Sequence, residues 1–336
     1  MSQEEVGWGA DMARTMVESS GYRRSGALKI KPIPPFDFQL TVRKPAGWDL
    51  FTRGEIYEGG TLWTSIRFAG KPVGLRISSS GTLTNPLLQA EVYTKDGISS
   101  AEMQRMRALV VECLGAEQDL RGFYNFASKD PILKHVVEDL YGMHDTQAAS
   151  LFNPVVLSIC LQMARLKRSL EMMDAINRRY GETLDFDGKR ILLQPAAERI
   201  ARLSPTVFAR ACKLGYRAKY IVASARMIAG GFPEMHEIMS MNPADAKEKL
   251  MGLPGVGDYA ADIINPHAGF PIDAWSVDVF GLLFFGREPR NRRAAVERVK
   301  REGMRRWGDW SWMAFFYVAQ DLDNLSRRLG VRLRLE

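Results

Sequence analysis

The stretch GVGDYAADIINPHAGFPIDAWSVD, residues 255–278, contains the pattern that decides the fold. Gly255, Gly257 and Ala260 spell G-x-G-x-x-A, and Asp278 follows about twenty residues later. In a dinucleotide-binding fold, such glycines follow a buried strand and hold a pyrophosphate. The same residues also suit a tight hairpin between two helices, which grips a phosphate backbone. The residues before the glycines distinguish the two alternatives.

The segment before the glycines, PADAKEKLMGLP at residues 243–254, favours the hairpin. Its Ala, Lys, Glu, Leu and Met residues are good helix formers, and Pro254 stands where a strand would need a backbone donor. The pattern predicts a helix that ends near Gly252, then a turn, then a second helix that begins around Asp258. We expect Asp258 to act as the N-cap of that second helix.

The turn of this hairpin predicts a phosphate-binding site. Leu253 and Val256 are expected to pack inward and hold the two helices together. Gly255 and Gly257 remove side chains where a backbone approaches closely, and they permit positive φ angles. The exposed amides at the start of the second helix then suit a phosphate. Leu253, Gly255, Val256 and Gly257 are therefore the candidate residues for binding a phosphate backbone.

The composition is that of an ordinary globular protein with an anionic partner. A length of 336 residues suits two or three domains, and 46% hydrophobic with 25% charged residues excludes a disordered chain. The formal net charge of +7 favours an anionic partner such as nucleic acid. No signal-peptide pattern and no run of about 18 apolar residues occurs, so we expect no membrane partner.

The cysteines and histidines carry no metal-binding pattern. The three cysteines, Cys113, Cys160 and Cys212, are too few for the four ligands that an iron–sulfur cluster usually takes. They form no C-x-x-C pair, and the histidines show no ligand spacing either. We expect buried thiols in a reducing compartment, no metal and no iron–sulfur cluster.

The chain divides into three parts. Residues 1–34 end in KIKPIPP and are predicted to form a tail or linker. Residues 35–120 hold the runs FDFQLTV, TLWTSIRF, PVGLRIS and QAEVYT and then a helical segment, which predicts an α+β domain with a small antiparallel sheet plus a helix. Residues 121–336 have apolar residues at every third or fourth position, which predicts a mostly α-helical body carrying the helix-hairpin-helix motif.

Several segments together resemble the helix-hairpin-helix DNA glycosylase superfamily. LPGVGDYAAD followed by Asp278 resembles the hairpin and the catalytic aspartate of that superfamily. LGYRAKYIVASARMI and WGDWSWMAFFYVAQDL resemble segments of 8-oxoguanine DNA glycosylases, and PPFDFQLTV resembles the entry of AlkA-type 3-methyladenine glycosylases. The likeness extends over residues 34–322 and implies an enzyme that acts on double-stranded DNA containing a damaged base.

The resemblance implies that Asp278 is the catalytic residue. Base removal breaks an N-glycosidic bond through a cation-like sugar, which an ionised carboxylate stabilises. Asp278 stands in the first turn of a very apolar predicted helix, where the helix N-terminus favours the charged carboxylate. The neighbouring acids have other interpretations: Asp262 is a solvated or structural carboxylate, and Asp273 caps or solvates a loop.

Tyr259 occupies the position of a lysine in bifunctional members of the superfamily. A phenol cannot form a Schiff base, so this departure predicts a monofunctional enzyme that uses water. With Trp275 and Trp310, Tyr259 is a candidate wall of the base pocket, where electron-rich rings attract cationic alkylated bases. Each ring fits core packing equally well. The closing segment WMAFF lacks the glutamine that 8-oxoguanine glycosylases present to the base.

Two further segments suggest contacts with DNA. SICLQMARL resembles the segment that inserts into the duplex, with Gln162 and Met163 at the inserting positions, although Met163 also suits a core methionine. Residues 287–306 hold nine basic and three acidic residues, which fits either a solvated helix face or contact with phosphates.

The expected function is that of a monofunctional DNA N-glycosylase of base excision repair, which hydrolyses the N-glycosidic bond of damaged bases, above all alkylated purines, that are flipped out of duplex DNA. The alternatives are an oxidised-purine glycosylase with AP-lyase activity and a non-catalytic helix-hairpin-helix protein that only binds DNA. We expect a monomer without cofactor; the resemblance is compatible with a monovalent cation at the hairpin. A cytoplasmic location is expected, nucleoid-associated in a prokaryote, or a nuclear one in a eukaryote.

Overall fold

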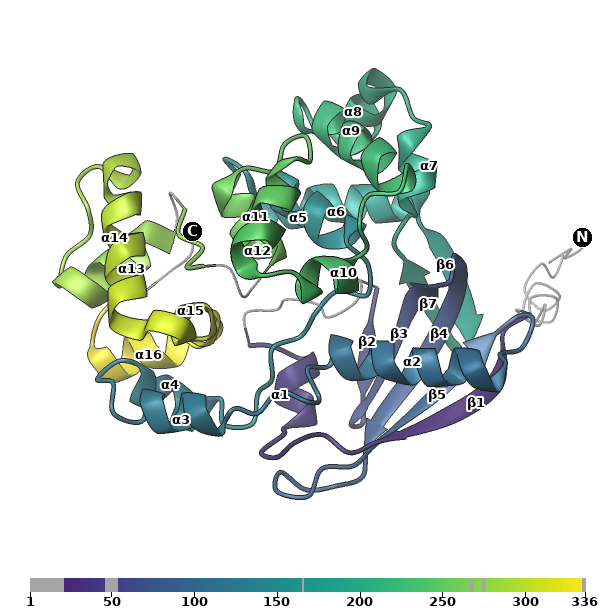
Figure 1. Ribbon diagram of the computed structural model, residues 1–336, viewed down its shortest axis with the longest axis horizontal. Helices are drawn as coiled ribbons and strands as arrows, with labels where there is room; N and C mark the ends of the chain where they lie inside the picture. Colours follow the sequence, from purple (N-terminus) through teal and green to yellow (C-terminus); the bar gives the residue numbers. More distant parts are fainter. Residues whose placement is uncertain (1–20, 46–53, 165, 266–268, 274–275, 334–336) are drawn as a thin grey trace, which may run out of the picture.

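The computed structural model describes residues 21–45, 54–164, 166–265, 269–273 and 276–333. These residues form an N-terminal sheet and two groups of helices (Figure 1). The expected order, a small sheet with a helix followed by a mostly helical body, is confirmed. No helix in these ranges is long and apolar enough to cross a membrane.

The N-terminal sheet has five antiparallel strands in the order β1-β5-β4-β3-β2. The strands are β1 (Arg23–Ile30), β2 (Ile56–Glu58), β3 (Thr61–Phe68), β4 (Lys71–Ser79) and β5 (Leu88–Thr94). Helix α2 (Ser100–Cys113) begins at a capping box and lies across one face of the sheet, where Met106 and Val110 join its apolar core (Figure 1). Three of the predicted strands and the predicted helix are thus confirmed.

Two segments of this domain differ from the prediction. Residues 23–30, placed in the tail, form β1, because Leu28 and Ile30 alternate into the core and pair with β5. FDFQLTV, predicted as a strand, contains helix α1 (Phe38–Val42). The Asp37 carboxylate accepts the Leu40 amide at 2.8 Å, and this N-cap outweighs the strand propensity of the residues that follow.

A β-hairpin interrupts the region that was predicted to be helical. Strands β6 (Glu182–Phe186) and β7 (Lys189–Leu193) pair antiparallel and contact β3 and β4, so they extend the sheet domain (Figure 1). Asp187 and Gly188 between them have φ angles of 49° and 71°, as a two-residue type I′ turn requires. The Asp-Gly pair between alternating residues was a hairpin signal that the helical prediction overlooked.

The helical body consists of two apolar clusters. The middle cluster contains α5 (Phe152–Leu161), α6 (Leu166–Tyr180), α7 (Ala197–Ala201), α8 (Pro205–Cys212), α9 (Arg217–Ala229), α10 (Met235–Ser240), α11 (Pro243–Met251) and α12 (Asp258–Ile264). The terminal cluster contains α3 (Arg121–Ala127), α4 (Leu133–Asp139), α13 (Ser276–Phe285), α14 (Arg292–Trp307), the 3₁₀ turn η2 (Gly308–Trp310), α15 (Ser311–Gln320) and α16 (Leu322–Leu329). The chain therefore enters the terminal cluster, leaves it and returns.

A pair of carboxyl groups joins α4 to the end of α15. Asp321 is 2% exposed; burial and the neighbouring Asp139, which is within hydrogen-bonding reach, raise the pKa of Asp321 to about 7. Arg328 donates to the Asp139 carboxylate, with Nε at 2.9 Å from Oδ2. The protonated Asp321 carboxyl can therefore donate to the Asp139 carboxylate, which Arg328 also contacts.

This pair predicts a pH-dependent stability. The folded state binds the Asp321 proton more tightly than the unfolded state, so the stabilisation is complete below about pH 4 and is lost as the pH rises through about 7. At about 1.4 kcal/mol per pKa unit, the loss is up to about 4 kcal/mol. Asp321→Asn, which mimics the protonated acid, should flatten this dependence in urea unfolding at several pH values. Asp323→Asn, at an exposed position of α16, is the control. Parallel pH profiles for wild type and Asp321→Asn would contradict the assignment.

Candidate nucleic-acid interface and active site

The hairpin between α11 and α12 forms as predicted. Leu253 and Val256 are 1% and 5% exposed and pack in the middle cluster, which confirms their inward orientation. Gly255 has a φ angle of 85°, and a Cβ atom there would lie 2.7 Å from the Cβ atom of Tyr220 on α9. Both the backbone conformation and the close approach to α9 therefore require glycine at position 255.

The turn leaves two backbone amides unused in the described part of the chain. The N-cap of α12 is Gly257 rather than the expected Asp258, which is the first helical residue and pairs with lysines instead. The amides of Leu253 and Val256 bond within the turn. Those of Gly255 and Gly257 donate to no acceptor in the described part of the chain, so of the four candidate residues these two offer N–H groups to an anion.

A turn beside the hairpin carries the candidate inserting residue. The helical periodicity of residues 154–181 breaks between α5 and α6, and Met163 adopts a φ angle of 49° with its side chain 71% exposed. The alternative of a core methionine is therefore wrong. The Gln162 side chain donates to the carbonyl of Gly255, and Arg217 donates to the carbonyl of Gln162. These contacts bring the turn, the hairpin and the start of α9 together.

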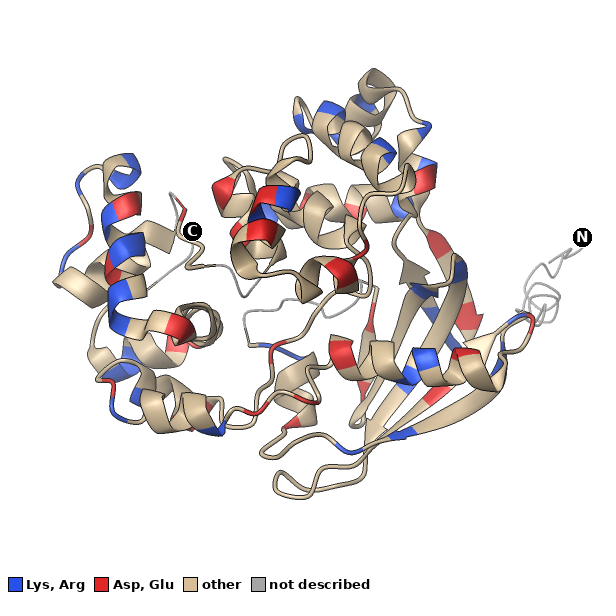
Figure 2. Ribbon diagram, viewed as in Figure 1, with Lys and Arg blue, Asp and Glu red and all other residues tan. Residues whose placement is uncertain are grey.

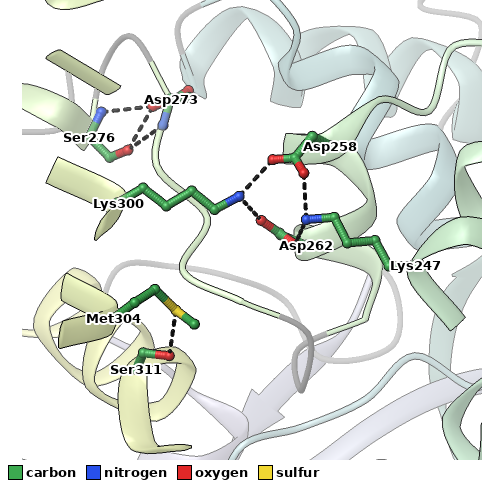
Figure 3. Close-up of polar contacts among 8 residues, drawn as sticks. All are labelled: Lys247, Asp258, Asp262, Asp273, Ser276, Lys300, Met304 and Ser311. Carbon is green, nitrogen blue, oxygen red and sulfur yellow. Dashed lines mark hydrogen bonds and ion pairs between the residues drawn. The ribbon is translucent and has the colours of Figure 1, made fainter. Parts of the chain in front are cut away.

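Asp273 lies where α12 and α13 meet. The amide and hydroxyl of Ser276 each donate to Asp273 Oδ1 at 2.8 Å, and the Asp273 amide donates to the Ser276 hydroxyl (Figure 3). These bonds confirm the expected capping role. Tyr259 of α12 also bonds the Asp273 carboxylate, and burial followed by this negative neighbour raises the pKa of Tyr259. The phenol at the lysine position is thus in direct contact with a carboxylate.

Asp278 stands in the first turn of α13, as predicted, but is held by an arginine. Arg292 at the start of α14 places Nη2 2.5 Å from Asp278 Oδ2, and the Asp278 side chain is 14% exposed. Its Oδ1 is buried and has no hydrogen-bond partner in the residues that the structure describes. Asp278 therefore joins α13 to α14 while one carboxylate oxygen stays unbonded.

Two lysines and two aspartates tie the hairpin to α14. Lys247 of α11 and Lys300 of α14 each contact both Asp258 and Asp262 at 2.6–2.7 Å (Figure 3). The Asp262 side chain is 0% exposed, whereas that of Asp258 is 57% exposed. Of the two interpretations of Asp262, the structural one holds and the solvated one is wrong. This ion-pair network fixes the terminal cluster against the first residue of α12.

The three candidate pocket residues are not joined by contacts. Trp275 lies outside the described residues. Tyr259 is half-buried beside Asp273, whereas Trp310 packs on Phe123 of α3 with ring centroids 5.7 Å apart. No ring contact links Tyr259 to Trp310 within the ranges given above. Their shared role in a base pocket remains a prediction.

Much of the basic run 287–306 is paired internally. Lysine and arginine positions recur along the ribbon of α14 (Figure 2). Arg292 and Lys300 hold the aspartates already described, and Arg305 and Arg306 both bond Glu302. These four cations therefore stabilise the protein itself, so only the others of the run are candidates for contact with phosphates.

Comparisons with known proteins indicate relatives among the DNA glycosylases. No protein-family model matches the chain. A curated DNA-3-methyladenine glycosylase of Bacillus subtilis is 28% identical over 210 residues, which cover 62% of this chain and 69% of the relative. A probable N-glycosylase/DNA lyase of Methanothermobacter thermautotrophicus is 28% identical over 240 residues, or 65% and 73% of the two chains. These relatives identify the chain as a DNA glycosylase.

Solved structures share the fold of this DNA glycosylase. The 3-methyladenine DNA glycosylase of Archaeoglobus fulgidus matches with a TM-score of 0.70 and 19% identity over 90% of this chain and 99% of that one. The 8-oxoguanine glycosylase/lyase of Clostridium acetobutylicum, in complex with dsDNA containing cytosine opposite 8-oxoG, matches with a TM-score of 0.65 and 18% identity over 92% and 99%. The fold is therefore one that a 3-methyladenine DNA glycosylase and an 8-oxoguanine glycosylase/lyase share.

Three contacts of the site had no signal in the sequence. The pairs Arg292–Asp278, Lys300–Asp262 and Arg217–Gln162 join residues far apart in the chain. Arginine and lysine are common on solvated helices, so neither their type nor their spacing marked them as partners. Only the folded arrangement of the glycosylase brings these groups together.

Proposed function

We propose that this DNA glycosylase hydrolyses the N-glycosidic bond of alkylated purines in duplex DNA, as a monofunctional monomer. One observation carries the proposal: at the meeting of hairpin and α13, the lysine position holds a phenol that bonds the Asp273 carboxylate. Position 259 itself therefore offers no amine, and Asp273 beside it offers a negative charge. A carboxylate suffices to stabilise a cation-like sugar and to orient water, whereas strand cleavage through an imine needs an amine.

Two carboxylates are candidates for this charge. The spacing from the hairpin favoured Asp278. In the structure, however, one carboxylate oxygen of Asp278 pairs with Arg292 and the other is buried. Asp273 contacts Tyr259, the residue that stands in the nucleophile's position. We therefore propose that Asp273 faces the sugar and that Asp278, through Arg292, holds α14 against α13. The catalytic assignment of Asp278 is the alternative that the same variants test.

The chemistry of alkylated purines suits such a site. Alkylation at a ring nitrogen of a purine gives the base a positive charge, which makes it a better leaving group than a neutral base. The protein then needs to stabilise the sugar cation more than to protonate the base. Tyr259, Trp275 and Trp310 are proposed as rings that attract the cationic base once it leaves the stack.

A panel of modified duplexes tests the proposed substrate. Oligonucleotide duplexes containing N3-methyladenine, N7-methylguanine or 8-oxoguanine are incubated with excess enzyme, and the free base is measured by chromatography. We expect release of both methylated purines, with slower or no release of 8-oxoguanine. Faster release of 8-oxoguanine would favour the oxidised-purine alternative. Binding without release of any base would identify a non-catalytic DNA-binding protein.

The phenol at position 259 predicts that no covalent intermediate forms. Borohydride added during turnover should trap no protein–DNA adduct, because the trapped species is an imine and Tyr259 cannot form one. Product strands should break only after treatment with alkali. Tyr259→Lys, which restores the amine, is the informative comparison variant. A strong trapped band with the wild-type enzyme would show that another amine serves as nucleophile.

The free amides of the hairpin predict how a charge there affects DNA binding. Gly257 has room for a side chain, and aspartate is a favourable N-cap, so Gly257→Asp should fold normally. Its carboxylate would oppose the phosphate, so we expect roughly tenfold weaker binding to every duplex sequence. Gly257→Ala controls for the added bulk. Equal affinities of the two variants, measured by fluorescence anisotropy at several salt concentrations, would argue against phosphate binding at this turn.

A further inference from the structure

We propose that Arg217 is a positioning residue for base excision, which holds residues 162–164, the insertion turn, in the conformation that presents Met163. The inference rests on the proposed insertion of Met163 and adds the group that keeps the turn in place. Arg217 is the first residue of α9, and its guanidinium donates through Nη2 to the carbonyl of Gln162. The bond therefore acts on the backbone immediately before Met163.

The insertion turn requires such a support because its backbone is strained. Met163 has a φ angle of 49° and a side chain that is 71% exposed, so its own packing does not maintain the conformation. A residue other than glycine in the left-handed region costs about 1–2 kcal/mol. Contacts of the neighbouring residues must offset that cost. Gln162 supplies them from both its backbone and its side chain, which bonds the carbonyl of Gly255.

Helix α9 holds the hairpin as well as the insertion turn. The hydroxyl of Ser224 donates to the carbonyl of Pro254 at 2.7 Å, and the Tyr220 side chain fills the space beside Gly255. Arg217 lies two turns before Ser224 on the same helix. The proposed phosphate-binding turn and the turn with the proposed inserting side chain are therefore both held by α9. Binding of the DNA phosphates at the hairpin then sets where Met163 enters the duplex.

Stability alone does not account for an arginine at this position. The Nε atom of Arg217 is buried and has no acceptor in the residues described, and an unbonded buried donor costs about 1–3 kcal/mol. Lysine would place a methylene group there and still carry a terminal donor. The planar guanidinium nevertheless stacks on the Tyr216 ring, 4.8 Å from its centroid, which orients Nη2 toward the turn.

The test compares a lesion in a fully paired duplex with the same lesion in an unpaired bubble. Insertion of Met163 compensates for the stacking and pairing that are lost when the target base leaves the duplex. A paired base loses both, so its excision depends on insertion far more than that of an unpaired base. Arg217→Met removes the donor and keeps the length of the side chain. We expect its single-turnover rate to fall about tenfold on the paired duplex and by less than about twofold on the bubble. Arg217→Lys should restore part of the difference.

The controls separate this inference from the proposed function. Arg210→Met, at an exposed arginine of α8, should leave both rates unchanged. If wild type releases no base from either substrate, the proposed function fails. If Met163→Ala lowers both rates equally, the insertion proposal fails. If Met163→Ala changes the ratio and Arg217→Met does not, only the role of Arg217 is overturned. Thermal melting checks folding, and Arg217→Gln replaces Arg217→Met if the latter does not fold.

Discussion

Asp273→Asn is expected to lower single-turnover excision by at least about a hundredfold. The substitution removes the negative charge beside the developing sugar cation, while the amide oxygen can still accept the Ser276 bonds that cap α13. Folding and duplex affinity should therefore persist. The rate is measured with enzyme in excess over an alkylated duplex, and affinity is measured on undamaged DNA.

Asp278→Asn is the matched comparison, because Asp278 stands in the first turn of the helix that Asp273 caps and the substitution keeps the side-chain volume. If Asp278 has the structural role proposed here, its variant should lose stability through the ion pair with Arg292 and keep most of its excision rate. The opposite result, loss of excision in Asp278→Asn with near-normal excision in Asp273→Asn, would return the catalytic role to Asp278. It would also make Arg292 the group that orients that carboxylate.

Asp262→Asn is expected to destabilise the protein by about 3–5 kcal/mol, because it leaves two lysines without their buried counter-charge. The Asp262 side chain is 0% exposed, and both of its oxygens contact lysine amines at 2.7 Å. Asp258→Asn removes a carboxylate that contacts the same two amines but is 57% exposed, so we expect a loss of less than about 1 kcal/mol. Urea unfolding at neutral pH measures both.

The difference between the two variants is the decisive quantity. If they are equally destabilised, water reaches Asp262 and the network is an ordinary surface feature. A large loss confined to Asp262→Asn would show that the hairpin depends on Lys300, and hence on α14, for its position. Screening by added salt should weaken the Asp258 contribution more than the Asp262 contribution.

Local patterns in the sequence predicted the hairpin and most of the sheet. The glycines and the helix-forming segment before them placed α11 and α12 within a residue or two, because backbone conformation and helix propensity are properties of neighbouring residues. Alternation of apolar residues placed β3, β4 and β5 for the same reason. At Asp37, a single cap overrode the strand pattern that follows it.

The candidate site was less accessible to such patterns. Met163 was singled out by resemblance, and its exposure follows from a break between α5 and α6 that helical periodicity does not reveal. Asp273 and Asp278 are both acids near the start of one helix, and only their partners, Tyr259 and Arg292, distinguish them. Those partners approach through the tertiary fold, which spacing along the chain does not encode.

The return of the chain to the terminal cluster has a consequence for folding. Residues 123–143 share one apolar core with residues 270–333, while the segment between them builds the middle cluster and sends β6 and β7 back to the sheet. A cut at any one point therefore exposes apolar surface on both fragments, so no part is expected to fold as an independent module. Unfolding should be a single cooperative transition. DNA bound at the hairpin then protects the distant sheet from unfolding as well as the helices that hold it.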